Sequence, residues 1–485
     1  MKEKNTKKEV STIPTDDHLT NDFFQDVLDM LPYTPNDGQV EAFAAFAHFL
    51  FVGDERSVFL LNGYAGTGKT SLMGVVVQVL TQRGIKVVLL APTGRAAQVF
   101  SEYSHRAAFT IHRKIYRQDR YLSQGFSLAE NKHSNTIFIV DEASMIANSS
   151  SEGSFFGSGH LLDDLVQYVY NGNGCKLMLM GDGAQLPPVG QSESPALNSD
   201  VMRGYGLTPY NITLTQIARQ AADSGILQNA TIVRDIITRS VLEEPKLSLT
   251  QYSDIESLSG EFLLETLSDA YERDGIEETV IITRSNKRAT LYNNGVRNTI
   301  LYREEELSIG DILLVSKNNY YWANEYDNID FIANGDVMVV KRVWGEVEQA
   351  YGLRFANVTV ELPDHNHIEM DVKIVIDSLQ SSTPALTVAQ SERLYNEVLN
   401  ECTGNKSERY AQMKKHQYFN ALQVKFAYAV TCHKSQGGQW KNVFVDMGGI
   451  MPEALNTVDF LRWLYTAITR AEKRVFLINC PLSVR

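Results

Sequence analysis

Gly63-Tyr64-Ala65-Gly66-Thr67-Gly68-Lys69-Thr70 is the stretch of sequence that decides the fold, because it joins an apolar run at 57–61 to a helix-like run at 71–80. Strand, G-x-x-x-x-G-K-T loop and helix follow one another in the order of a phosphate-binding loop. The glycines let backbone N–H groups turn toward phosphates at a helix N-terminus, where the helix dipole favours negative charge. Lys69 can reach the β- and γ-phosphates, and the Thr70 hydroxyl can hold Mg²⁺. The residues expected to bind the nucleotide here are Gly63, Ala65, Gly66, Thr67, Gly68, Lys69, Thr70 and Ser71.

Short β-rich runs alternate with helical runs on both sides of this loop, and many of the runs end in a turn that carries polar residues. This alternation predicts an α/β fold with parallel sheets, whose ligands collect at the carboxyl ends of the strands. Strands are expected at 58–61, 86–90, 136–140 and 177–180, and in a second unit at 279–283, 426–430, 443–445 and 474–478. Residues 303–423 have a different, β-rich texture that predicts an insertion in the second unit.

The composition bounds the class of protein. The 485 residues, 44% hydrophobic and 21% charged, predict a globular chain of about three domains. No apolar run approaches the roughly 20 residues of a membrane helix, and the N-terminus lacks the apolar core of a signal peptide, so we expect a cytoplasmic protein. The four cysteines form no C-x-x-C pair, which fits a reduced compartment and argues against a zinc site. The net charge of -13 argues against nucleic-acid binding, since proteins of that class usually have a basic surface. It does not exclude it, because a strand held in an internal channel needs only local hydrogen-bond donors.

Two carboxylates end the apolar run at 137–140. In the context of the phosphate loop, Asp141 is expected to hold Mg²⁺ and Glu142 to polarise an attacking water molecule. The plainer alternative is a pair of solvated acids at a strand end. Further along, Gln185 lies in the strand-end loop 181–190, where its amide could sense a γ-phosphate.

Several segments stand in a fixed order along the chain. They are APTGRAA at 91–97, TIHR at 110–113, DEAS at 141–144, GDGAQLPPVG at 181–190, TCHKSQG at 431–437 and YTAITRA at 465–471. In this order and spacing the chain resembles the superfamily 1 helicases, and the wording is most similar to the 5′-to-3′ branch, superfamily 1B, of RecD-like and Dda-like DNA helicases. The resemblance covers about residues 36–478 and is weakest over 303–423.

The resemblance implies two RecA-like parallel-sheet domains with ATP between them, a small β-hairpin insertion in the first and an SH3-like β-rich insertion in the second. The expected parts are a mobile tail at 1–18, a first RecA-like domain at 19–275 with a pin-like insertion at about 108–133, a second RecA-like domain at 276–302 and 424–485, and the SH3-like domain at 303–423.

The resemblance also assigns roles around the nucleotide. Arg470 would reach the γ-phosphate as an arginine finger, and Arg219 matches the second arginine of the family. Gln39 stands where the family places an adenine reader, and its amide can pair with adenine N6 and N7. Gln439 stands where the family often has an acid, and could bond the ribose without charge. The expected catalytic set is Lys69, Glu142, Gln185, Arg219 and Arg470.

On the other side of the sheets the resemblance implies contacts with single-stranded DNA. Hydroxyls and backbone amides suit phosphates, whereas His and aromatic faces suit bases. The implied DNA-contacting residues are Pro92, Thr93, His112, Thr431, His433 and Lys434. Residues 114–126 lie where related helicases insert a pin, and Tyr121 or Phe126 could stack on the last base pair or pack on the hairpin's own base.

The expected function is that of an ATP-dependent DNA helicase, a hydrolase that moves 5′ to 3′ on single-stranded DNA and unwinds duplex. Its cofactors would be ATP and Mg²⁺, and its partners single-stranded and forked duplex DNA, with no membrane. It is expected to be monomeric, with DNA repair or DNA recombination proteins as candidate partners. Two alternatives stay open: a translocase without strand separation, and a nucleotide-gated binding subunit of a RecD-like complex.

Overall fold

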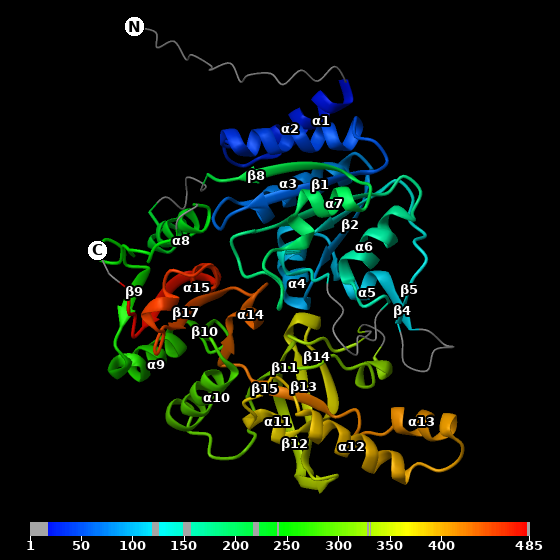
Figure 1. The fold of residues 1–485 in the computed structure, drawn as a ribbon, viewed down its shortest axis with the longest axis vertical. Coiled ribbons are helices and arrows are strands. Elements are labelled where there is room, and N and C mark those ends of the chain that lie inside the picture. Colours follow the sequence, from blue (N-terminus) through cyan, green and yellow to red (C-terminus); the bar gives the residue numbers. More distant parts are fainter. Residues whose placement is uncertain are drawn as a thin grey trace.

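The computed structural model describes residues 18–118, 126–148, 157–216, 223–239, 242–326, 329 and 331–482. Within these ranges, none of the helices has the length and apolar character that a membrane crossing requires. Three bodies make up the fold: two sheets flanked by helices and one closed barrel (Figure 1). Of the predicted features, almost all of the tail, Tyr121 and Arg219 lie outside the described residues.

The first body is a six-stranded parallel sheet in the order β3-β2-β6-β7-β1-β8. Its strands are β1 (Ser57–Gly63), β2 (Lys86–Ala91), β3 (Ala108–Thr110), β6 (Thr136–Val140), β7 (Lys176–Gly181) and β8 (Thr208–Leu214). Its helices are α1 (His18–Met30), α2 (Asp37–Phe51), α3 (Lys69–Gln82), α4 (Gly94–Ser104), α5 (Ile111–Ile115), α6 (Leu161–Tyr170) and α7 (Ser199–Gly204).

Alternation along the central strand builds two cores, one on each face of this sheet. Val58 and Leu60 of β1 pack in the core that contains α5 and α6. Phe59 and Leu61 pack in the core that contains α1, α2 and α3. Successive side chains of a strand point to opposite faces, so an uninterrupted apolar run marks a strand that is covered on both sides.

A small hairpin leaves the first body after α5. Its strands are β4 (Tyr116–Gln118) and β5 (Phe126–Leu128), which pair antiparallel with Tyr116 opposite Leu128. In Figure 1 this hairpin lies beside the barrel.

The second body is a five-stranded parallel sheet in the order β16-β10-β17-β18-β9. Its strands are β9 (Ile255–Leu258), β10 (Thr279–Thr283), β16 (Ala429–Thr431), β17 (Trp440–Asp446) and β18 (Ala471–Ile478). Its helices are α8 (Gly225–Ile237), α9 (Leu263–Asp274), α10 (Asn286–Gly295), α14 (Cys432–Ser435) and α15 (Val458–Ile468). The predicted α/β class with two parallel sheets is confirmed.

The boundary between the two bodies differs from the expected one at residue 275. β9 pairs with β18 at the edge of the second sheet. The apolar face of α8, including Ile226 and Val233, is buried in the core of that sheet against α15. Residues from α8 onward therefore belong with the second body, because its edge strand and its core bury their apolar surface.

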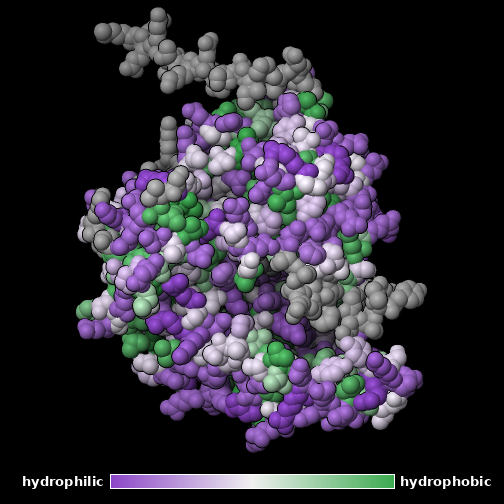
Figure 2. Space-filling view, viewed as in Figure 1, coloured by the Kyte–Doolittle hydropathy of each residue, from purple (hydrophilic) through white to green (hydrophobic). Residues whose placement is uncertain are grey.

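The third body is a closed barrel that interrupts the second sheet. Its strands are β11 (Ile312–Val315), β12 (Val337–Ala350), β13 (Leu353–Leu362), β14 (Ile368–Val375) and β15 (Leu422–Phe426). The helices α11 (Ile376–Gln380), α12 (Val388–Glu401) and α13 (Lys406–Lys414) lie between its last two strands in the chain. Figure 2 shows hydrophilic residues over most of the visible face, which is hollowed where the three bodies meet.

The barrel and the second sheet share a short connection. Only Ala427 and Tyr428 separate the end of β15 from the start of β16. The Tyr428 hydroxyl donates to Asp311 over 2.8 Å and accepts from Arg303 over 2.6 Å. Arg297 donates to the same Asp311 carboxylate over 3.0 Å. We call Arg297, Arg303, Asp311 and Tyr428 the junction cluster; Asp311 within it is fully buried.

Candidate active site and nucleic-acid interface

The phosphate loop runs from the end of β1 to the start of α3. Gly66 and Gly68 have φ values of 75° and 79°, which side chains other than glycine seldom adopt. A Cβ on Gly63 would lie 2.6 Å from the Lys69 side chain, so this position also requires glycine. The Lys69 ammonium donates to the carbonyl oxygens of Gly63 and, over 3.2 Å, of Tyr64. The loop thus curves around its own lysine.

Asp141 and Glu142 lie beside this loop, at the end of β6. The Thr70 hydroxyl donates to the Asp141 carboxylate over 3.2 Å, and the Glu142 N–H donates to it over 2.7 Å. Burial, with the neighbouring Glu142 charge, raises the pKa of Asp141 to about 7. A buried carboxylate in this condition is stabilised by a nearby cation.

The donors at this point fit a magnesium ion. Mg²⁺ prefers oxygen ligands and usually keeps waters and substrate phosphates around one or two protein ligands. Thr70 and Asp141 present a hydroxyl and a carboxylate side by side. The described part of the chain contains no group of three or more His, Cys, Asp or Glu suited to a metal, so a cation here would share its coordination with phosphate and water.

Arg470 reaches this site from the second body, just after α15. Its guanidinium lies 3.7 Å from the Glu142 carboxylate of the first body. The residue is 4% exposed, and it also donates to the Gly438 carbonyl over 3.4 Å. Its Nε–H is buried and has no hydrogen-bond partner among the described residues. A buried guanidinium with an unused donor is suited to an anion in the cleft.

Tyr465 of α15 makes the closest polar contact between the second body and the phosphate loop. Its hydroxyl accepts from the Ala65 N–H over 2.8 Å and donates to Asp182 over 2.6 Å. Its neighbour Thr466 accepts from the Leu186 N–H over 2.8 Å. Burial and the Asp182 charge raise the pKa of Tyr465 well above its ordinary value, so it is a neutral donor. The two bodies are closed upon each other here.

The three glutamines predicted at the nucleotide lie in different surroundings. Gln39 donates to the Thr67 carbonyl over 3.1 Å and accepts from the Asn36 N–H over 3.1 Å, so its amide joins a helix cap to the phosphate loop. Gln185 is buried, and its Oε1 has no partner among the described residues. Gln439 is exposed, and its main-chain carbonyl accepts from the Arg95 guanidinium over 2.6 Å. The structure thus joins Gln39 to the phosphate loop, buries Gln185 in the segment after β7, and holds the Gln439 backbone against Arg95 of α4.

A cleft of about 820 Å³ opens where the three bodies meet. It brings together four of the residues predicted to contact DNA, which are Thr93, Thr431, His433 and Lys434. The Lys434 ammonium has no hydrogen-bond partner in the part of the chain that the structure describes, and burial lowers its pKa to about 8. A lysine held in this way favours an anionic ligand. Pro92 precedes Thr93 but does not line the cleft.

The other two described residues of this set lie elsewhere, in an aromatic cluster between hairpin and barrel. The His112 ring lies 5.7 Å from Tyr116 and 6.4 Å from Phe331. Phe126 lies 4.7 Å from Tyr320, which lies 5.4 Å from Phe331. We call these five residues the hairpin–barrel cluster. His112 and Phe126 therefore connect two bodies, a position that the sequence did not reveal.

Several residues that the structure places at the site have no role in the sequence-based prediction. Tyr465 and Asp182 both lie in motifs quoted above, and their types, a phenol and a carboxylate, were the available signal. Arg95 stacks on the Trp440 ring, with its guanidinium 4.1 Å from the centroid. The contacts of Tyr465, Asp182 and Arg95 form only when the two bodies dock against each other, and local sequence patterns do not encode that docking.

Fold and site together define a nucleotide-binding P-loop ATPase with two RecA-like bodies. The family model described as "AAA domain" matches residues 34–236, and the model described as "UvrD-like helicase C-terminal domain" matches 426–478. Together with the motif order and the relatives below, these matches support a likeness to the superfamily 1B helicases, the RecD-like and Dda-like helicases.

Three curated relatives illustrate the likeness. The chain is 24% identical to the ATP-dependent DNA helicase dda of Enterobacteria phage T4, over 88% of this chain and 95% of that one. It is 25% identical to an uncharacterized protein of Acanthamoeba polyphaga mimivirus, over 87% and 96%. With the ATP-dependent RecD2 DNA helicase of Deinococcus radiodurans it shares 26% identity over 86% of this chain but only 46% of that protein. Among solved structures, a Pif1 helicase at forked DNA matches with a TM-score of 0.47 and 16% identity over 92% of each chain.

Proposed function

We propose that this protein is an ATP-dependent DNA helicase that moves 5′ to 3′ on single-stranded DNA and unwinds duplex. The observation that carries the proposal is the approach of Arg470, from the second body, to within 3.7 Å of Glu142 in the first. The complete site forms only when the two RecA-like bodies close on the nucleotide, so hydrolysis and domain movement are linked.

In this proposal Lys69 binds the β- and γ-phosphates, and Thr70 and Asp141 hold Mg²⁺. The ion, when bound, would supply positive charge at the phosphate oxygens. Glu142 orients the attacking water and accepts its proton. Arg470 donates to the phosphoryl group as negative charge spreads over its oxygens, and Arg219 would be the second arginine in this role.

We propose further that Gln185 senses the γ-phosphate and that Gln39 contacts adenine. Gln39 uses one donor and one acceptor site of its amide in the present structure, which leaves the second N–H and the second oxygen lone pair for this contact. We propose that the exposed side-chain amide of Gln439 contacts the ribose, since its hydrogen bond with Arg95 uses only the main-chain carbonyl.

The cleft between the bodies is the proposed path of the tracked strand. Thr93 belongs to the first body, whereas Thr431, His433 and Lys434 belong to the second. When the two RecA-like bodies close or open at the nucleotide, the contacts of one body with the strand would shift past those of the other. The β4–β5 hairpin, held by the barrel, is the proposed element that parts the duplex. One copy of the chain suffices for this scheme. In it, the first RecA-like domain ends near residue 216.

Two substrates and one variant test the proposal. We expect the wild type to unwind a duplex with a 5′ tail and to leave one with a 3′ tail intact. Glu142→Gln is expected to lose DNA-stimulated hydrolysis by about a thousandfold, since the acceptor of the water proton is removed. Glu41→Gln, an exposed glutamate of α2, is the matched control.

The same assays separate the rival functions. Hydrolysis stimulated by single-stranded DNA without strand separation would indicate a translocase. Hydrolysis that DNA does not stimulate would instead favour a nucleotide-gated binding subunit. Intact hydrolysis in Glu142→Gln would contradict the assigned mechanism.

A further inference from the structure

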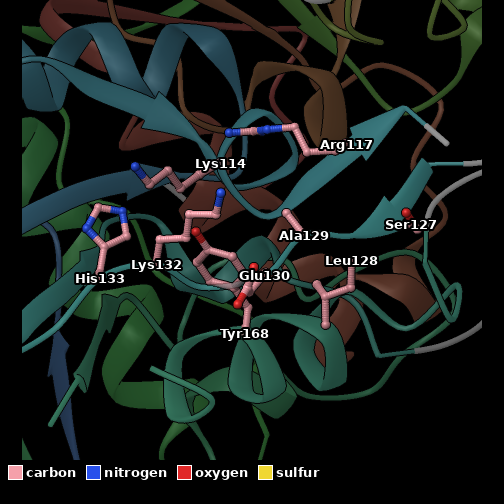
Figure 3. A pocket seen from close by; sticks show the side chains of 9 residues that line it. All are labelled: Lys114, Arg117, Ser127, Leu128, Ala129, Glu130, Lys132, His133 and Tyr168. Carbon is pink, nitrogen blue, oxygen red and sulfur yellow. The ribbon is translucent and has the colours of Figure 1, made fainter. Parts of the chain in front are cut away.

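A second hollow, of about 500 Å³, lies at the base of the β4–β5 hairpin (Figure 3). Cationic side chains from α5, β4 and the segment before β6 surround it, together with a tyrosine of α6. We call it the basic hollow, and its defining residues are Lys114, Arg117, Lys132, His133 and Tyr168. None of them lines the three-body cleft.

The walls of the basic hollow are held in place by hydrogen bonds. The Arg117 guanidinium donates to the carbonyls of Arg113 over 2.8 Å and Tyr116 over 2.7 Å. The Asn131 amide donates to the Tyr168 carbonyl over 2.9 Å, which fixes the segment before β6 on α6. The hollow is therefore a built surface of the first body, and ligand binding would require little ordering of its walls.

The three Lys and Arg side chains of the basic hollow exceed the one acid that lines it. In the described ranges, no carboxylate forms an ion pair with Lys114, Arg117 or Lys132, whereas several other arginines of the chain do so, as Arg288 does with Asp446. One acid, Glu130, lines the hollow. Burial and the Arg117 charge lower the pKa of Lys114, and burial, Lys114 and Lys86 lower that of His133.

The basic hollow is opposite in sign to the chain as a whole, which has 58 acidic and 45 basic residues and a net charge of -13. Cations without an ion-pair partner around one hollow favour a polyanion with regularly spaced charges.

We propose that the basic hollow binds the phosphodiester backbone of the strand that the hairpin turns away from the cleft during unwinding. The inference rests on the proposed helicase function. The tracked strand occupies the cleft, so a strand parted at the hairpin passes the hairpin base, where Lys114 and Lys132 can contact its phosphates. Contacts between these cations and phosphates do not depend on the base, as a sequence-independent helicase would need.

Equilibrium binding to forked DNA without nucleotide tests this site separately from hydrolysis. One fork carries a natural 3′ tail on the displaced strand, and the other carries an uncharged methylphosphonate 3′ tail. We expect the wild type to bind the natural fork roughly threefold to tenfold more tightly, since two phosphate contacts are lost in the second. The variant Lys114→Gln/Lys132→Gln is expected to bind both forks alike.

The salt dependence gives a second readout. Loss of two contacts to a single strand should make the slope of log affinity against log salt shallower by about 1.4. The matched control is Lys406→Gln/Lys415→Gln, which removes two exposed lysines of the α12–α13 region and should keep the wild-type preference. Thermal melting of both variants checks that they fold.

Three results would overturn the inference. The first is a Lys114→Gln/Lys132→Gln variant that keeps the preference for the charged tail. The second is a wild type that has no such preference. The third is a preference that depends only on charge in the duplex arm, tested with methylphosphonates placed there. A wild type that shows the preference but separates no strands would contradict the helicase function and leave the binding site standing.

Discussion

Tyr465 joins helix α15 of the second body to the phosphate loop by a hydrogen bond. Its hydroxyl serves two partners, the partly buried Ala65 N–H and the buried Asp182 carboxylate. In Tyr465→Phe both would lose this hydrogen bond, so we expect the free energy of unfolding to fall by about 1–3 kcal/mol. Denaturant titration measures this change. Tyr103→Phe, at a 48% exposed position, is the control and should stay within about 0.5 kcal/mol of wild type.

His112 gives the molecule a pH dependence. Its pKa falls from the ordinary 6.5 to about 4, because the imidazole is removed from water. The unfolded chain therefore takes up a proton at a higher pH than the folded one. The stability from this residue is complete above pH 6.5 and is lost as the pH falls toward 4, by at most about 3 kcal/mol.

The comparison with His112→Phe isolates this effect, since other groups titrate in both proteins. We expect the two unfolding free energies, plotted from pH 7 to 4.5, to converge or cross as the wild type loses stability faster. Parallel curves would show that His112 is solvated in the folded protein.

At the level of elements, the contact between hairpin and barrel is the feature with the clearest consequence. Tyr320 is its middle ring, 4.7 Å from Phe126 and 5.4 Å from Phe331. An aromatic contact of this kind contributes about 0.5–1.5 kcal/mol beyond burial. We expect Tyr320→Ala to slow duplex unwinding by up to about tenfold, because the hairpin loses its support.

Hydrolysis stimulated by single-stranded DNA should be unchanged in Tyr320→Ala, since the nucleotide site and the cleft are untouched. Tyr302→Ala, at an 83% exposed position, is the control and should unwind normally. An equal loss of hydrolysis and unwinding in Tyr320→Ala would mean that the ring supports the fold and not the hairpin.

The central strands could be predicted because their sequence carries a local signal. β1, β2, β6 and β7 lie where apolar runs end in polar turns, and Lys69, Asp141 and Glu142 follow from those turns. β9 was not predicted, because its sequence IESL is short and mixed and becomes a strand only by pairing with β18. His112 was predicted at DNA, but its surroundings depend on Phe331, more than 200 residues further along the chain.

Across the whole molecule, charge is distributed so that few cations face the proposed DNA path. Among the residues lining the three-body cleft, the lysines and arginines are Arg95, Arg284 and Lys434. These three cations can make at most three phosphate contacts. We therefore expect the slope of log affinity against log salt for single-stranded DNA to be about −2. Fluorescence anisotropy from about 50 to about 300 mM salt would measure this slope. Over that range the Debye length falls from about 14 to about 6 Å. A slope steeper than about −5 would require a larger basic surface than this cleft has.

The junction cluster has a mechanical meaning for this architecture. Ala427 and Tyr428 alone connect β15 to β16, and the Tyr428 hydroxyl is hydrogen-bonded to Asp311 and Arg303, so we expect the barrel to move with the second sheet as a stiff arm. A small rotation at the nucleotide would then become a longer displacement where the barrel meets the hairpin. Tyr428→Phe would soften the arm, and in an optical trap we expect such a motor to stall at a lower opposing force while it still consumes ATP.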